Sequence, residues 1–334
     1  MARLLLISCM AVGSWALDTV KYGAFLPTAT YSIANQLGFF EGYNLDVVYN
    51  QVPNSTAAFS SLLGGQYDIL TATVDNALNY RFNQNQDVTV LGQLDQGPDL
   101  VLVSVPSIVS IAQLEGKPII VDSPVSGYAY LLRKMLSGVD YSFMTVGGTQ
   151  ARYSALLNGS LPNGTAVYAT ILNYPFTKQA AGLNILARVS DVVVPITSSA
   201  FTVGRTSAPV TRFVAAMYAA NMLLQNPRAK ACSIRAIAAQ LGVARSVAAS
   251  EYASATDPLT GEVSGGNFTV NPAGIMNDVL VRQEFGGFVV PAGFDFAGAL
   301  VPGAGQLIDY SIRDAAVALY YRQPVTGNCT VRCK

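Results

Sequence analysis

Short apolar runs alternate with longer amphipathic stretches over the first two hundred residues of the chain. Apolar runs of about four to eight residues bounded by turn residues predict strands, and apolar spacings of three and four residues predict helices. The expected strands span residues 19–23, 45–49, 67–71, 88–94, 100–105, 117–121, 142–146, 166–171, 184–188 and 192–196. Between them the pattern predicts a helix ending near residue 38 and helices at 56–63, 75–82, 108–114, 126–136, 149–157 and 174–181. This alternation predicts an α/β fold of mainly parallel sheets flanked by helices.

The pattern restarts once along the chain and then becomes helical. Two similar blocks of strands and helices meet near residues 97–98 and again near 197–199. We therefore expect a two-lobed protein with a cleft between its lobes. Lobe I comprises residues 17–97 and 199–334, and lobe II comprises the inserted residues 98–198. The later part of lobe I is expected to hold helices at 211–224, 228–242, 244–252, 272–285 and 306–321 and an exposed loop at 257–271.

The first sixteen residues have the pattern of a secretory signal peptide. Arg3 is followed by the apolar run 4–12 and by Ser14-Trp15-Ala16, a small-x-small site that predicts cleavage after Ala16. A buried first helix is the alternative. Secretion agrees with five Asn-x-Ser/Thr sequons, which predict glycosylation at surface positions. These sequons begin at Asn54, Asn158, Asn163, Asn267 and Asn328.

The composition excludes several function classes. Charged residues make up only 12% of the chain, with 20 basic and 20 acidic side chains, so no basic field for nucleic acid is expected. Beyond the N-terminus no apolar run reaches the ~20 residues of a membrane span. The chain has no His, which excludes a Cys–His nucleophile and a zinc site with His ligands. We expect a monomer with no cofactor, and no catalytic constellation is recognisable.

Three cysteines remain after cleavage of the leader. The spacing of Cys329 and Cys333 predicts a small C-terminal disulfide loop. Alternatively, one of these two residues reaches Cys232 and ties down the tail.

Candidate ligand-binding residues lie where strands end and helices begin, because helix N-termini present unpaired amides at that edge of a sheet. Ser123, Ser126 and the amides near Gly127 are suited to a polar ligand group, although Ser126 is equally suited to capping its helix. Aromatic side chains in these segments are suited to stacking on a ring or to core packing. The full set of candidates is Phe25, Leu26, Pro27, Thr28, Thr71, Thr73, Asp75, Gln93, Ser123, Val125, Ser126, Gly127, Tyr128, Thr149, Asn173, Tyr174 and Phe176.

Four segments resemble a known family. They are residues 36–47, with Gly38-Phe39-Phe40-Glu41, the turn 63–69 with Gly64-Gly65, the stretch 114–121, and Asn226-Pro227. In this order they resemble the type II periplasmic-binding-protein fold, in the branch of sulfonate-, taurine- and nitrate-binding proteins and the thiamine-pyrimidine synthases of fungi. The resemblance covers nearly the whole mature chain. The relatives that it implies are secreted fungal members of the family.

The resemblance implies a secreted solute-binding protein that closes its lobes on a small polar or heterocyclic ligand. No Arg or Lys falls in the four main candidate segments, although Lys178 follows one, and this favours a neutral or weakly charged ligand. One alternative is an interaction protein that kept the fold without a ligand. Another is an enzyme like the thiamine-pyrimidine synthases. Those enzymes consume a histidine of their own chain and carry a cysteine-rich motif. This chain has no His and no cluster of Cys residues, so that chemistry is disfavoured.

Overall fold

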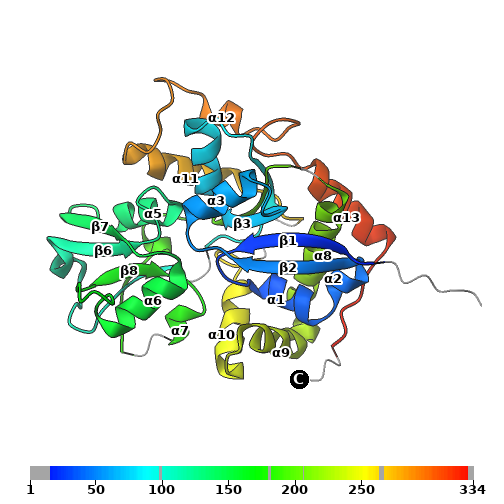
Figure 1. Ribbon diagram of the computed structural model, residues 1–334, viewed down its shortest axis with the longest axis horizontal. Coiled ribbons are helices and arrows are strands. Elements are labelled where there is room, and N and C mark those ends of the chain that lie inside the picture. Colours follow the sequence, from blue (N-terminus) through cyan, green and yellow to red (C-terminus); the bar gives the residue numbers. More distant parts are fainter. Residues whose placement is uncertain (1–15, 98–99, 180–181, 206, 263–266, 330–334) are drawn as a thin grey trace, which may run out of the picture.

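In the computed structural model the chain folds into two lobes, each built around one sheet (Figure 1). The structure describes residues 16–97, 100–179, 182–205, 207–262 and 267–329. The first sheet has the strand order β2-β1-β3-β10-β4. Its strands are β1 (Asp18–Ala24), β2 (Leu45–Gln51), β3 (Ile69–Thr73), β4 (Thr89–Gln93) and β10 (Ser199–Val203).

The second sheet has the order β7-β6-β8-β5-β9 and lies in the other half of the molecule in Figure 1. Its strands are β5 (Val101–Ser104), β6 (Lys117–Val121), β7 (Tyr141–Thr145), β8 (Ala169–Leu172) and β9 (Asn184–Arg188). Both sheets are mixed. β1 pairs in parallel with β2 and β3, and β6 pairs in parallel with β7 and β8. β10 and β5 run antiparallel to both of their neighbours.

The two-lobed α/β fold confirms the prediction from the sequence pattern, but two expectations are wrong. The segment 257–271 was expected to be an exposed loop, yet Glu262, Phe268 and Val270 within it are buried. One predicted strand is also misplaced. Residues 192–196 were expected to form a strand, which is wrong, since the strand of this region is β10, farther along the chain. Pro195 explains the difference, because proline has no backbone N–H to give to a sheet.

Helices cover both sheets. In the first lobe they are α1 (Ala29–Gln36), α2 (Phe39–Gly42), α3 (Ser55–Leu63), α4 (Val74–Leu78), α8 (Ala208–Leu224), α9 (Lys230–Leu241), α10 (Arg245–Ala255), α11 (Pro272–Glu284), α12 (Phe296–Ala299) and α13 (Ser311–Arg322). In the second lobe they are α5 (Gly127–Met135), α6 (Thr149–Asn158) and α7 (Phe176–Gln179). Short helical turns span Asn79–Asn83, Ile111–Leu114, Val189–Asp191 and Pro227–Ala229.

Each lobe has its own hydrophobic core. In the first lobe Tyr22 of β1 packs against Tyr31 of α1 and Phe213 of α8, with ring centroids 5.1 Å and 4.9 Å apart. These rings join the sheet to α1, which follows its first strand, and to α8, which follows its last strand in the chain, β10. In the second lobe the strands β5 and β8 are buried along their whole length, and the sheet packs against α5 and α6. The independent cores let the lobes behave as separate bodies joined by two chain crossings.

The two crossings between the lobes run side by side. The first follows β4 and the second leads into β10. The Asp95 carboxylate in the first crossing accepts hydrogen bonds from the amides of Gly97 (2.9 Å) and Ser199 (3.2 Å). Gly97 has φ +80° and a Cβ there would lie 2.7 Å from Ile196 Cδ1. The sharp turn at this crossing therefore requires glycine.

The disulfide differs from the pairing expected first. Cys232 of α9 is bonded to Cys329, so the expected Cys329–Cys333 bond is wrong and the alternative pairing with Cys232 is confirmed. Cys333 lies outside the described residues. The reason is spatial, because the tail crosses α9, where Arg235 donates to the carbonyl of Cys329 (3.1 Å).

Four of the five sequon asparagines are exposed, namely Asn158, Asn163, Asn267 and Asn328. Asn54 is half-buried, because its side chain caps α3 by accepting from the amide of Ala57 at 2.8 Å. The predicted signal peptide falls almost wholly outside the described residues. Among the described residues, no helix is long and apolar enough to cross a membrane.

Candidate ligand-binding site

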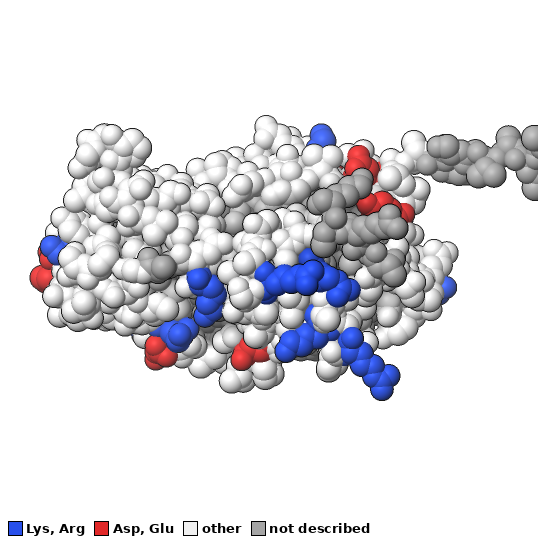
Figure 2. Space-filling view, turned by 90° about the horizontal axis from the view of Figure 1, so that it is seen from below, with Lys and Arg blue, Asp and Glu red and all other residues white. Residues whose placement is uncertain are grey.

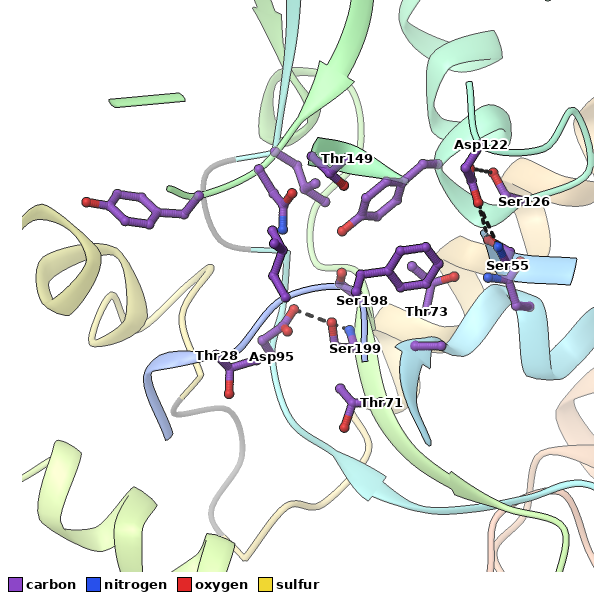
Figure 3. Close-up of a pocket in the computed structure, with 18 of the residues that line it drawn as sticks. Thr28, Ser55, Thr71, Thr73, Asp95, Asp122, Ser126, Thr149, Ser198 and Ser199 are labelled. Atoms are coloured by element: carbon purple, nitrogen blue, oxygen red, sulfur yellow. Dashed lines mark hydrogen bonds between the residues drawn. The ribbon is translucent and has the colours of Figure 1, made fainter. Parts of the chain in front are cut away.

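A cavity of about 70 Å³ lies between the lobes, beside the two crossings (Figure 3). Its walls come from segments far apart in sequence: the loop after β1, the end of β3, both crossings, and the loops that follow β6 and β8. This is the edge at which the parallel strands of each sheet end. The topology therefore gathers strand-end residues from two sheets around one space.

The first-lobe wall is polar and partly helical at its edge. Thr28 caps α1, its hydroxyl accepting from the amide of Tyr31 at 3.1 Å. Thr71 and Thr73 lie at the end of β3, and both contribute to the cavity lining. Phe25 and Leu26 add apolar surface from the loop after β1.

The second-lobe wall is built from Asp122 and Ser126 after β6, Tyr128 in the first turn of α5, and Asn173 and Tyr174 after β8. The Ser126 hydroxyl accepts from the Ala129 amide (3.3 Å) as the cap of α5 and donates to Asp122 (2.7 Å). Ser126 is thus a helix cap and a cavity residue at once. Burial raises the pKa of the Tyr128 hydroxyl, and the nearby Asp95 carboxylate adds to the effect.

Asp122 joins the two lobes across the cavity. One of its oxygens accepts from the Ser126 hydroxyl of its own lobe. The other accepts from the backbone amide of Ser55 (3.0 Å) and from the Ser55 hydroxyl, both at the start of α3 in the first lobe. Figure 3 shows Asp122 between these two serines. We call this group, Asp122 with Ser55 and Ser126, the aspartate bridge.

Further contacts hold the lobes together around the aspartate bridge. The amide of Gly148 donates to the carbonyl of Pro53 at 2.7 Å, and the amide of Gly127 donates to Asn76 Oδ1 at 3.2 Å. Farther out, Lys134 pairs with Glu284 at 2.7 Å. Because these contacts all connect one lobe to the other, the structure has the lobes in a closed arrangement.

One basic side chain, Arg152 of α6, lines the cavity and is 1% exposed. Its guanidinium donates to the carbonyls of Gly147 (3.0 Å) and Ile171 and to the hydroxyls of Thr149 (3.1 Å) and Thr170 (2.8 Å). Burial lowers its pKa, and the carboxylate of Asp122 opposes that effect. Most of the donor capacity of Arg152 is therefore directed at the second lobe itself.

Two buried carboxyl groups line the cavity without a basic neighbour. Burial raises the pKa of Glu262 from 4.5 to about 7, against the hydrogen bonds that it accepts from the amides of Thr30 (2.7 Å) and Ala29 (2.8 Å). Burial also raises the pKa of Asp95, although several hydrogen bonds to it lower the pKa. Glu262 and Asp95 lie close enough to raise each other's cost of ionisation.

The structure brings most of the predicted site residues to this cavity. They are Phe25, Leu26, Pro27, Thr28, Thr71, Thr73, Ser126, Tyr128, Thr149, Asn173 and Tyr174. The other six lie outside its lining, and they are Asp75, Gln93, Ser123, Val125, Gly127 and Phe176.

Each of these six residues has other contacts. Asp75 forms a buried ion pair with Arg282, and Gln93 bonds the amide of Asn271 at 2.7 Å. Gly127 faces Asp75 and Thr73, close to the cavity but behind its wall. Ser123 and Val125 line a separate groove near α3. Phe176 packs on a second-lobe tyrosine, Tyr153, at 4.8 Å between ring centroids.

Several lining residues were not predicted from the sequence. They are Ser55, Ala72, Asn76, Asp95, Leu100, Asp122, Arg152, Ser198, Ser199, Glu251 and Glu262. Asp122 follows a predicted strand directly, and Ser55 follows a capping asparagine, so both carry a recognisable local signal. Arg152 and Glu262 carry none, because only the docking of their helices and loops turns them toward the cavity.

The outer surface differs in charge from the cavity. Figure 2, which views the molecule from below, shows Lys and Arg side chains gathered on that face. Within the described residues no cluster of three or more acidic or Cys side chains could hold a metal ion.

Two mixed sheets flanked by helices and joined by two crossings, with a cavity at their strand ends, define the two-lobed periplasmic-binding-protein fold. The family model described as NMT1/THI5 like matches residues 28–229, which is more than half of the chain. The chain belongs to the NMT1/THI5-like family. No curated protein is significantly similar in sequence.

Solved structures agree on the fold. The ligand-binding component of an ABC-type import system from Staphylococcus aureus, solved with zinc bound, has a TM-score of 0.63 at 15% identity, over 90% of this chain and 99% of that chain. The alkanesulfonate-binding protein SsuA from Xanthomonas axonopodis pv. citri, bound to MOPS, has a TM-score of 0.61 at 16% identity, over 95% of this chain and 96% of that chain. The CA3427 gene product of Candida albicans is described as having the generic periplasmic binding protein fold. Its TM-score is 0.62 at 14% identity, over 95% of this chain and 99% of that chain.

Proposed function

We propose that the chain is a secreted solute-binding protein that closes two lobes, residues 17–97 with 199–334 and residues 98–198, on one small polar ligand. The observation that carries this proposal is the cavity walled by both lobes and spanned by the aspartate bridge. The similar S. aureus and X. axonopodis proteins are named for ligand binding, which supports the same role. We propose no catalytic step, since the Ser55 and Ser126 hydroxyls beside Asp122 already serve as the contact between the lobes and as a helix cap.

The proposed motion is a hinge closure about the two crossings. Asp95 bonds one crossing to the other, and each lobe keeps its own core during the motion. Closure forms the bonds of the aspartate bridge and the bond from Gly148 to Pro53, which are available only when the lobes meet. A ligand that touches both walls adds to these contacts and so favours the closed arrangement.

The cavity also limits the size of the ligand. Its volume of about 70 Å³ is less than half of the ~150 Å³ that admits benzene in an apolar cavity. The closed arrangement thus suits a molecule of about four or five heavy atoms. A heterocyclic ligand requires the lobes to close less far than in this structure.

Native mass spectrometry of the protein purified from its own source tests the proposal, with thermal melting against a panel of small polar molecules. We expect the mass spectrum to show a bound molecule of low mass. In the melting panel we expect one ligand to stabilise the fold by about 2.7 kcal/mol at one hundred times its Kd. Leu26→Trp should fill the cavity and abolish the shift, because Leu26 lines it. Leu157→Trp, at a position that is 48% exposed on α6, is the matched control. A protein that carries no molecule and responds to none overturns the proposal.

A further inference from the structure

We infer that the cavity takes a positively charged nitrogen group, an ammonium or amidinium of about four heavy atoms. This inference rests on the proposed ligand-binding function and names the ligand class of the same site. Three observations carry it. Most titratable groups around the cavity are acidic, the first amides of α1 already donate to Glu262, and buried oxygens at the cavity wall can accept from a ligand.

The titratable groups that line the cavity are mostly acidic. Asp95, Asp122, Glu251 and Glu262 contribute carboxyl groups, and Arg152 is the one guanidinium among the described lining residues. Arg152 and Asp122 interact with each other electrostatically, so their charges largely cancel. For Asp95 and Glu262, none of the main causes that shift the pKa is a basic side chain of the described residues.

At the start of α1, the amides that would hold an anion are already used within the chain. The N-terminus of α1 points toward the cavity, and such helix ends attract negative charge. Its first two amides instead donate to Glu262, whose two oxygens accept from Ala29 and Thr30. An anionic ligand group at this end of the helix would face the Glu262 carboxylate at close range.

Buried side-chain oxygens at the cavity can accept hydrogen bonds from a ligand. Thr73 Oγ1 and Asn173 Oδ1 have no hydrogen-bond partner within the described residues, and both residues line the cavity. Thr71, which is 4% exposed, lies at the same wall beside the hydroxyl of Tyr22. A buried polar oxygen without a partner is costly, so a ligand rich in N–H groups would remove that cost. Ammonium and amidinium groups donate and do not accept, so each of these oxygens can serve as their acceptor.

The raised pKa values of Asp95 and Glu262 agree with this geometry. A cation beside a buried carboxyl lowers its pKa, so binding should release protons near neutral pH. The titratable groups facing Glu262 are Asp95 and Tyr22, and its other neighbours are the amides of α1. None of these would supply the positive charge in place of a ligand.

Three small molecules of the same shape separate the possibilities: acetamidinium, acetamide and acetate, which carry a positive, zero and negative charge. Calorimetry of the full chain should show acetamidinium binding at least 10-fold tighter than acetamide, with acetate weaker still. Acetamidinium affinity should rise between pH 6 and pH 8 with proton release, while acetamide affinity stays flat. Leu26→Trp should abolish the binding heat, which places the ligand in the cavity.

Glu262→Gln and Asp95→Asn should each weaken acetamidinium at least 10-fold and leave acetamide within 2-fold. Glu41→Gln, at an exposed position on α2, is the control for loss of one negative charge. Should the cavity variants fail to fold, the comparison of the three ligands on the unmodified chain still decides the matter.

Acetate or acetamide binding as tightly as acetamidinium overturns the inference and leaves the proposed function standing. Absence of binding by all three ligands also overturns the inference, and the proposed function is then decided by the native mass spectrum.

Discussion

Removing the Ser55 hydroxyl should open the lobes without unfolding either one. This hydroxyl donates to Asp122 across the cavity, together with the Ser55 amide, which stays in place in Ser55→Ala. A hydrogen bond to a charged group contributes about 1.5 kcal/mol or more when buried, which corresponds to roughly a 10-fold change in an equilibrium. The ratio of closed to open molecules should therefore fall about 10-fold.

Small-angle scattering of the ligand-free chain should show a larger radius of gyration for Ser55→Ala than for the unmodified protein. Apparent ligand affinity should fall in proportion to the closed fraction.

Ser126→Ala is the matched control, because Ser126 donates to the same carboxylate from within its own lobe. It should lower the free energy of unfolding and leave the scattering curve unchanged. If the two variants open the lobes equally, or if neither does, the aspartate bridge does not control closure.

Three other predictions concern stability. The pKa of Glu262 is raised from 4.5 to about 7, so between these two pH values the folded state binds more protons than the unfolded state. Stability should therefore fall by about 3 kcal/mol as pH rises from 4.5 to 7 and then level off, and urea unfolding of Glu262→Gln should lack this slope. Asp75→Ala should cost about 3–5 kcal/mol by leaving Arg282 charged and buried, whereas Asp75→Leu with Arg282→Met should recover most of that loss in urea unfolding. Reduction of the Cys232–Cys329 bond, which spans 97 residues, should cost about 2–5 kcal/mol, and an unchanged Tm in dithiothreitol would contradict it.

Much of the fold was predictable because it depends on local patterns. Apolar runs placed β1, β2 and β6 correctly, and amphipathic spacing placed α8 and α11. The caps at Thr28 and Ser126 lie where the sequence predicts helix starts. These signals act over a few residues, since they reflect backbone propensity and one buried face.

The site was only partly predictable, because its residues meet through long-range packing. Strand ends were expected to line a cleft, and Thr71, Tyr128 and Asn173 do line one. Asp75 was a candidate by position, yet Arg282, which lies 207 residues later, occupies its carboxylate. Periodicity says which face of a helix is buried but not which distant charge it meets.

The sequence by itself determined the two α/β lobes, the helix starts at the strand ends and the resemblance to the periplasmic-binding-protein fold, since these follow from hydrophobic order and short motifs. Only the tertiary structure decided the character of the cavity. It turned Arg152 inward, bonded Glu262 to the start of α1 and set Asp122 against Ser55. The reason is that these contacts depend on tertiary packing, within one lobe for Arg152 and Glu262 and between the lobes for Asp122 and Ser55, and no single segment encodes that packing.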